Sequence, residues 1–167
     1  RCIPNIIVTA PMNEKELRDL IFGYRSARIV LAGVSLGIFD ALDLQQPKRA
    51  EAIAAHCGTQ LRATRALLDG LAAIEVLEKR DGGYCNSAAA EHTLTSHGER
   101  SRRNLLLHDL WHWNLWGRLE ASLRSGNPVA DRSGDPFFSN PEVLRDFFPN
   151  LARAMEQTSR EESELLA

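Results

Sequence analysis

The sequence predicts a mainly α-helical fold that contains a winged helix-turn-helix with a small β-hairpin. Three observations predict this class: apolar residues recur at helical spacing over most of the chain, helix and turn signals alternate over residues 44–94, and one Asp-Gly turn joins two short extended runs. The chain has 167 residues, 44% hydrophobic and 25% charged. This suits a single globular domain, or a small domain with an appended arm.

Residues 14–43 are expected to form a long helix with a break near Gly33 or Gly37. The acidic residues at its start suit the positive end of a helix dipole. From Ile29 to Leu42 the segment is apolar nearly all round, so it must be covered on more than one side. It is either a central helix buried within one protomer or a helix covered by a second copy of the chain. The apolar residues at helical spacing are Leu17, Leu20, Ile21, Tyr24, Ala27, Leu31, Val34 and Ile38.

Residues 44–94 carry the winged-helix pattern. A short helix after Pro47 is expected to end at Gly58, and Thr59 is expected to cap the next helix. The segment VLEKRDGGYCNS should then form a hairpin around its Asp-Gly turn. The core-facing candidates of the second helix are Leu61, Leu67, Leu68 and Leu71.

Charge and composition disfavour several classes of function. Residues 44–94 contain six basic and six acidic side chains, so the would-be DNA-binding unit has no net charge and no nucleic-acid partner is expected. No apolar run approaches the roughly 20 residues of a membrane span. The odd number of widely spaced cysteines, three in all, indicates reduced thiols in a cytoplasmic protein.

Residues 99–125 are predicted to form a helix that holds all three tryptophans and two of the histidines. His108 and His112 share a face at a spacing that can bind zinc, but the glutamate of an HExxH motif is missing and Asp109 is expected to point elsewhere. Trp111 and Trp116 should flank the histidines, with Trp113 toward another side. The cluster is either packing or the wall of a substrate pocket that sandwiches an aromatic ring. A Gly- and Pro-rich loop and a last helix from near Pro141 follow.

The ordered segments SARIVLAGVSLGIFDAL, IAAHCGTQLRATRALLDGLAAIEVLEKRDGGYCNSAAAEHTL, WGRLEASLRSGNP and FPNLARAMEQTS resemble the N-terminal dimerisation domain of S-adenosylmethionine-dependent O-methyltransferases, the group of plant caffeate-type and bacterial polyketide-tailoring enzymes. The resemblance implies a homodimer, an aromatic or polyketide-like small-molecule acceptor, and S-adenosylmethionine (SAM) as cofactor of the whole enzyme. It also implies that Met155 of the "AM" pair lines the acceptor pocket. The candidate substrate-binding residues are His108, Trp111, His112, Trp116 and Met155.

The domain expectations follow from the same resemblance. Residues 1–11 are expected to be an expression remnant or a disordered end, residues 12–98 the dimerisation helix plus winged helix, and residues 99–167 a helical extension toward a SAM-binding Rossmann-like domain. The glycine-rich turn of that domain is missing from the sequence, so no catalytic, cofactor-binding or metal-binding residue is assigned and this chain alone is not expected to be active. The alternatives are a winged-helix transcriptional regulator and a stand-alone small-ligand-binding module.

Overall fold

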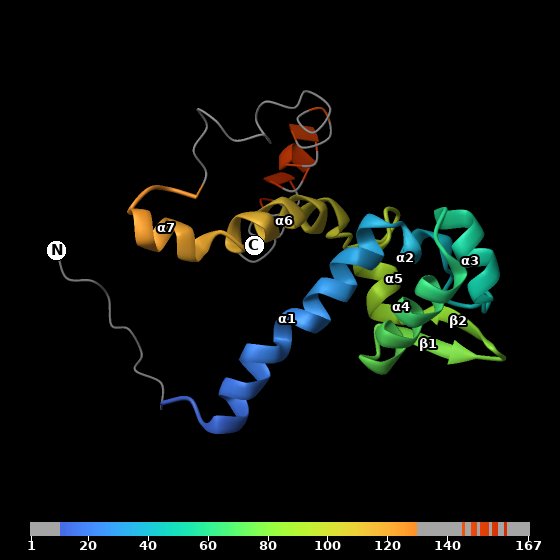
Figure 1. Cartoon of the computed structure of the whole chain (residues 1–167). Coiled ribbons are helices and arrows are strands. Elements are labelled where there is room, and N and C mark those ends of the chain that lie inside the picture. The colour runs from blue at the N-terminus through green and yellow to red at the C-terminus, as the bar shows by residue number, and fades with distance from the viewer. Residues whose placement is uncertain are drawn as a thin grey trace, which may run out of the picture.

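The computed structural model of the chain describes residues 11–129 and, beyond them, residues 145, 148–149, 151–153, 155–156 and 159. Over residues 11–129 a long first helix leads into a small globular unit, from which a second long helix returns (Figure 1). The elements are α1 (Glu14–Ser35), α2 (Ile38–Ala41), α3 (Ala50–Cys57), α4 (Leu61–Ala73), β1 (Leu77–Arg80), β2 (Gly83–Asn86), α5 (Ala88–Leu94), α6 (Arg103–Trp116) and α7 (Leu119–Ser125).

Helix α1 begins at a capping box. The side chain of Asn13 accepts a hydrogen bond from the backbone N–H of Glu16, and the Glu16 carboxylate accepts one from the backbone N–H of Asn13. The helix ends where the chain turns at Gly37, whose φ of 72° suits glycine, and α2 starts at once. The predicted break is therefore confirmed at Gly37. Gly33 continues the helix instead, at a close approach to the ring of Phe39.

The apolar stretch from Ile29 to Leu42 is largely covered within one protomer. It packs with the buried residues of α3, α4 and the hairpin, which is the first of the two alternatives, although Leu36 within it is 42% exposed. The reason for this packing is that the break at Gly37 folds this stretch back into its own core. The exposed part of α1 is its first half, because no residue from 11 to 28 is buried. The fully or nearly buried members of the stretch are Leu31, Val34, Ile38, Phe39, Ala41 and Leu42.

Helices α3 and α4 follow the predicted order. Gly58 ends α3 with a φ of 65°, as expected. The cap of α4 is Gln60 and not Thr59, because the hydroxyl of Thr59 bonds to that of Thr64 at 2.6 Å. Leu68 and its core-facing neighbours on α4 are buried or partly buried, but Leu61 is 38% exposed. Leu61 lies two turns before Leu68, in the first turn of the helix, and its predicted place in the core is wrong.

The predicted hairpin is confirmed. Strands β1 and β2 pair antiparallel with Leu77 opposite Asn86, and Asp81 and Gly82 both have positive φ, as a two-residue type I′ turn requires. An isolated bridge between Lys48 and Tyr84 ties the segment before α3 to the hairpin. The helix-helix-hairpin order is present, and its assignment to the winged-helix class stays a prediction.

Two elements differ from the sequence-based expectation. Helix α5 was not predicted, although the side chain of Ser87 accepts a cap hydrogen bond from the N–H of Ala90. The helix predicted over residues 99–125 is two helices, α6 and α7, separated at Gly117 and Arg118. The described residues of the last predicted helix have helical backbone, whereas its start near Pro141 and residues 1–10 lie outside the described part of the chain.

None of the described helices is both long enough and apolar enough to cross a membrane.

Candidate functional site

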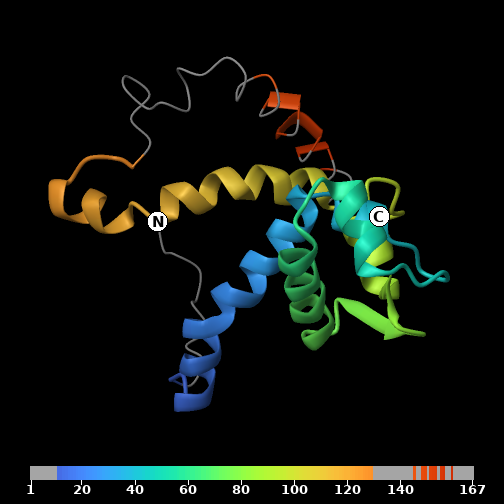
Figure 2. The same cartoon turned by 45° about the vertical axis from the view of Figure 1, so that its right-hand side comes forward.

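Helices α1 and α6 meet near the globular unit and diverge away from it (Figure 2). Where they meet, a hollow of about 400 Å³ opens between them, which we call the α1–α6 hollow. One residue of α1 and four of α6 line it: Leu31, Asp109, His112, Trp113 and Trp116. The four α6 residues follow the i, i+3, i+4, i+7 pattern, so the helix itself places them on one face.

The hollow contains two of the five predicted site residues, His112 and Trp116. Trp113 was expected on another side of α6, and that expectation is wrong, because the face is centred on Asp109 and Trp116 rather than on His108. His108 does not line the hollow but lies beside it, with its ring centroid 4.5 Å from that of His112 in an edge-to-face contact.

Trp111 and Met155 are the other two predicted residues. The backbone of Trp111 belongs to α6, and its side chain lies outside the described part of the chain. Met155 has helical backbone and is 63% exposed, and it is not among the residues that line the hollow. Whether either side chain contacts a substrate stays a prediction.

The polar groups of the hollow come from Asp109 and His112. Asp109 was expected to point away, but its carboxylate lies 3.5 Å from Nδ1 of His112. Burial lowers the pKa of His108, the neighbouring His112 lowers it further, and Asp109 opposes both. His108 is therefore an uncharged imidazole at neutral pH, which suits a hydrogen bond to a neutral hydroxyl. The guanidinium of Arg28 lies 5.7 Å from the ring centroid of Trp113, a cation–π contact that joins α1 to α6.

Two other kinds of site were considered in the sequence. Among the described residues, no group of three or more His, Cys, Asp or Glu side chains is placed to hold a metal ion. The glycine pair at positions 82 and 83 belongs to the hairpin.

Burial raises the pKa of the Cys57 and Cys85 thiols, which favours their protonated form.

Arg65 of α4 and Lys79 of the hairpin are engaged in ion pairs within the protein. Arg65 pairs with Glu51 at 2.7 Å, and Lys79 pairs with Asp69 at 2.6 Å. The Tyr84 hydroxyl also donates to Asp69 at 2.6 Å. These two bonds, from Lys79 first and Tyr84 second, lower the pKa of Asp69. The hollow on α4 is lined by the paired Arg65 and Asp69 and also by Arg62.

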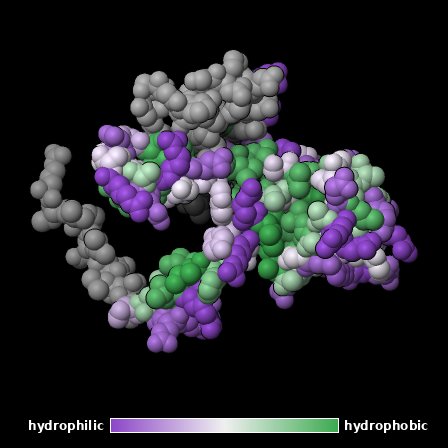
Figure 3. All heavy atoms as spheres, in the orientation of Figure 1, coloured by the Kyte–Doolittle hydropathy of each residue, from purple (hydrophilic) through white to green (hydrophobic). Residues whose placement is uncertain are grey.

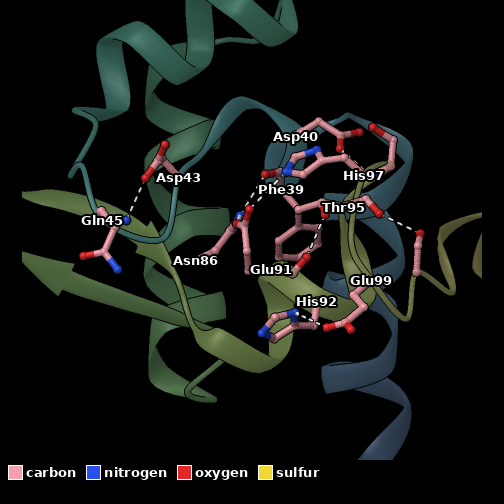
Figure 4. A network of polar contacts seen from close by, with 12 residues as sticks. Phe39, Asp40, Asp43, Gln45, Asn86, Glu91, His92, Thr95, His97 and Glu99 are labelled. Carbon is pink, nitrogen blue, oxygen red and sulfur yellow. Dashed lines mark hydrogen bonds and ion pairs between the residues drawn. The ribbon is translucent and has the colours of Figure 1, made fainter.

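A polar network around the buried side chain of Asn86 joins the hairpin to the segment before α6 (Figure 4). The fully buried Asn86 donates from Nδ2 to the carbonyl oxygen of Phe39 at 2.9 Å and to the Glu91 carboxylate at 2.6 Å. The other oxygen of Glu91 lies 3.0 Å from Nε2 of His97. The sequence analysis missed this network, since its members are scattered over α2, β2, α5 and a loop.

Comparison with known proteins identifies the class of domain. A family model described as the O-methyltransferase dimerisation domain matches residues 18–96. Acetylserotonin O-methyltransferase of Mus musculus is 34% identical over 135 residues, which cover 74% of this chain and 35% of that protein.

Comparison with solved structures also finds methyltransferases. The structure of PigF with SAH, from a Serratia S-adenosyl-L-methionine-dependent methyl transferase, has a TM-score of 0.65 at 27% identity and covers 85% of this chain and 44% of that one. An O-methyltransferase family protein from Burkholderia thailandensis shares the fold, with a TM-score of 0.69 at 24% identity over 93% of this chain and 45% of that one.

The chain spans between 24% and 41% of the length of the curated relatives that it matches. The matched region contains most of α1, the helix-helix-hairpin unit and α5. Residues 18–96 of this chain therefore belong to the O-methyltransferase dimerisation-domain family.

Proposed function

We propose that this chain is the dimerisation and acceptor-shaping part of a SAM-dependent O-methyltransferase that acts on an aromatic or polyketide-like small molecule. In this proposal two copies form a homodimer in the cytoplasm, and the face of α6 forms one wall of the acceptor site. The relatives named above are methyltransferases, one of them in complex with SAH, which supports a methyl-transfer role for the whole enzyme.

One observation supports the proposed homodimer. Four apolar side chains of α1, Leu17, Leu20, Ile21 and Tyr24, follow the i, i+3, i+4, i+7 pattern and form what we call the α1 stripe. All four are exposed, and Leu20 is 65% exposed. Figure 3 shows apolar surface over this half of α1. A stripe of this kind on an extended helix is unfavourable in water unless another apolar surface covers it.

The α1 stripe is continuous with the candidate acceptor wall. Continuing its spacing along α1 reaches Arg28, which contacts Trp113, and then Leu31, which lines the α1–α6 hollow. A second copy that covers the stripe would also reduce the access of water to the hollow. Exclusion of water strengthens the polar interactions of a bound acceptor.

The chemical role of this part is to bind and orient. In the hollow, Trp113 and Trp116 offer aromatic faces on which a planar acceptor can stack, and His112 offers a hydrogen bond to its hydroxyl. SAM supplies the methyl group in the whole enzyme. The described residues include no glycine-rich turn between a strand and a helix, so the donor site is assigned to the part of the relatives that this chain does not cover.

The dimer is tested by analytical ultracentrifugation of the chain over a range of concentrations. Leu20→Glu places a charge in the α1 stripe, and Ser26→Glu places the same charge on the opposite face of the same helix. We expect the parent chain and Ser26→Glu to be dimers at micromolar concentration and Leu20→Glu to be a monomer. A parent chain that stays monomeric, or a Leu20→Glu variant that remains a dimer, contradicts the proposal.

The acceptor wall is tested by titration with 1-naphthol, a planar phenol. All three tryptophans lie in α6, so quenching of tryptophan emission reports on this helix alone. We expect saturable quenching that Trp113→Leu weakens and that the distant variant Glu51→Gln does not. Quenching that is linear with concentration in every variant would show that the hollow holds no planar phenol.

A further inference from the structure

A side chain from another helix contacts the first residue of α6. The N-cap residue, Arg102, makes no side-chain cap hydrogen bond, and the first turn holds no acidic residue. The local contact at this helix start comes from Ser101, whose Oγ accepts a hydrogen bond from the backbone N–H of Arg103 at 3.4 Å. The side chain of Asp40, 63 positions before Arg103, lies next to the first turn as well.

Both carboxylate oxygens of Asp40 make contacts near the start of α6. Its Oδ1 accepts a hydrogen bond from the backbone N–H of Ser96 at 2.6 Å, and its Oδ2 lies 3.2 Å from Nε of Arg103. The two charged side chains are only 25% and 28% exposed. An ion pair shielded to this degree is screened less by salt than a surface pair.

Asp40 is itself held firmly. It lies in the four-residue helix α2, directly after the turn at Gly37. Its neighbours Ile38, Phe39 and Ala41 are buried in the core. The backbone that carries the carboxylate therefore cannot shift without disturbing close-packed side chains.

The segment between α5 and α6 is equally constrained. Thr95 is fully buried, its hydroxyl donates to the carbonyl oxygen of Glu91, and its own carbonyl oxygen accepts from the hydroxyl of Ser101. A Cβ at Gly98 would overlap with the carbonyl oxygen of His92. The segment therefore lies directly against the end of α5, and Asp40 joins this rigid support to the first residue of α6.

The direction of α6 decides where its tryptophans lie. Trp113 is ten residues beyond Arg103, a distance of about 15 Å along the helix axis. A tilt of about 10° at Arg103 would displace Trp113 by roughly 2–3 Å at that rise per residue. A displacement of that size alters the contact of Trp113 with Arg28 and the width of the α1–α6 hollow.

We propose that Asp40 is a positioning residue for the acceptor site, because it sets the direction of α6 through Ser96 and Arg103. The part of this inference that concerns the acceptor rests on the function proposed above. Asp40 touches no substrate, and it acts through the placement of Trp113.

The test uses a reporter form of the chain in which Trp111→Phe and Trp116→Phe leave Trp113 as the only tryptophan. Asp40→Asn keeps an acceptor for the N–H of Ser96 and removes the charge opposite Arg103. The matched control is Glu51→Gln, which removes one carboxylate charge from the Glu51–Arg65 pair, far from α6 in the chain and between two other helices.

Acrylamide quenching of Trp113 is measured about 20 °C below the thermal midpoint of each variant, where each chain is folded. A role limited to global stability leaves quenching at that temperature unchanged. We expect a higher Stern–Volmer slope for Asp40→Asn and an unchanged slope for Glu51→Gln. Adding Arg103→Gln to Asp40→Asn is expected to raise the slope no further, since both substitutions break the same contact.

Affinity for 1-naphthol provides the second readout. We expect Asp40→Asn to weaken it roughly tenfold. If no form of the chain binds 1-naphthol, the proposed acceptor site fails, while quenching still decides whether Asp40 positions α6. If Asp40→Asn does not fold, Arg103→Gln is measured in its place, because it leaves the hydrogen bond between Asp40 and Ser96 intact. Equal quenching in folded Asp40→Asn, Arg103→Gln and Glu51→Gln would overturn the proposal.

Discussion

Gly23 and Gly33 lie in the same helix, and the same substitution is expected to act on stability in opposite directions at the two sites. A Cβ at Gly23 would meet no atom within 4 Å. Gly23→Ala should therefore stabilise the fold by about 0.5–1 kcal/mol, the usual gain when alanine replaces glycine within a helix.

At Gly33 the gain in stability from replacing glycine with alanine is opposed by steric overlap of the new Cβ. A Cβ there would lie 2.8 Å from Cε2 of Phe39, 3.1 Å from its Cζ and 3.4 Å from Cδ1 of Leu71. Phe39 is 1% exposed and Leu71 is fully buried, so neither side chain can withdraw toward solvent. Overpacking of this kind costs about 1–3 kcal/mol. We expect Gly33→Ala to destabilise the fold by about 1 kcal/mol after the helical gain is included.

The assay is urea denaturation followed by far-UV circular dichroism, at one protein concentration because a dimer makes apparent stability depend on concentration. The difference in unfolding free energy between the two variants isolates the packing cost of about 1–3 kcal/mol. If Gly33→Ala raises the denaturation midpoint as much as Gly23→Ala does, the close approach of α1 to Phe39 is absent and the reasoning fails.

Three further predictions concern pH and packing. Burial, and then the hydrogen bond to Asp69, raise the pKa of Tyr84 to about 12, so the folded state binds this proton more tightly than the unfolded state and stability should fall as pH rises from about 10 to about 12. Tyr84→Phe should reduce this fall in urea titrations across that range, and an identical slope would contradict the assigned shift. Burial, and then a neighbouring imidazole, lower the pKa of His108 below 6.5, so stability should decrease as pH drops below that value, and His108→Gln should lessen the decrease. Gly98→Ala should cost about 1–3 kcal/mol by thermal denaturation, since its Cβ overlaps with backbone oxygen of His92, and a variant as stable as the parent would exclude this packing.

Local signals accounted for much of the fold. The capping residues, the helical spacing of the apolar side chains and the Asp-Gly turn act over a few neighbouring residues, so the sequence can reveal them. The helix after Pro47, its end at Gly58 and the hairpin around Asp81 are therefore where they were expected. Thr59 as a cap was wrong, because its hydroxyl bonds to that of Thr64, one turn beyond the start of α4.

The site was predicted less completely. His112 and Trp116 line the α1–α6 hollow together with Trp113, which had been assigned to another side of α6. Helical spacing shows which residues share a face, and it does not show which face of α6 lies toward α1. That choice depends on contacts with distant segments: Leu106 and Leu107 pack against the core, and Leu31 of α1 lines the hollow.

By itself the sequence determined that this protein is mainly helical, where its helices turn, and which kind of domain it resembles. Only the tertiary structure decided which apolar residues stay exposed. Ile29 to Leu42 looked most in need of a partner, yet the turn at Gly37 buries this stretch, and the α1 stripe around Leu20 is left in water. The physical reason is that burial depends on which distant segments meet. Asp40 likewise reaches Arg103 across 63 positions of the chain, a contact that no local pattern encodes.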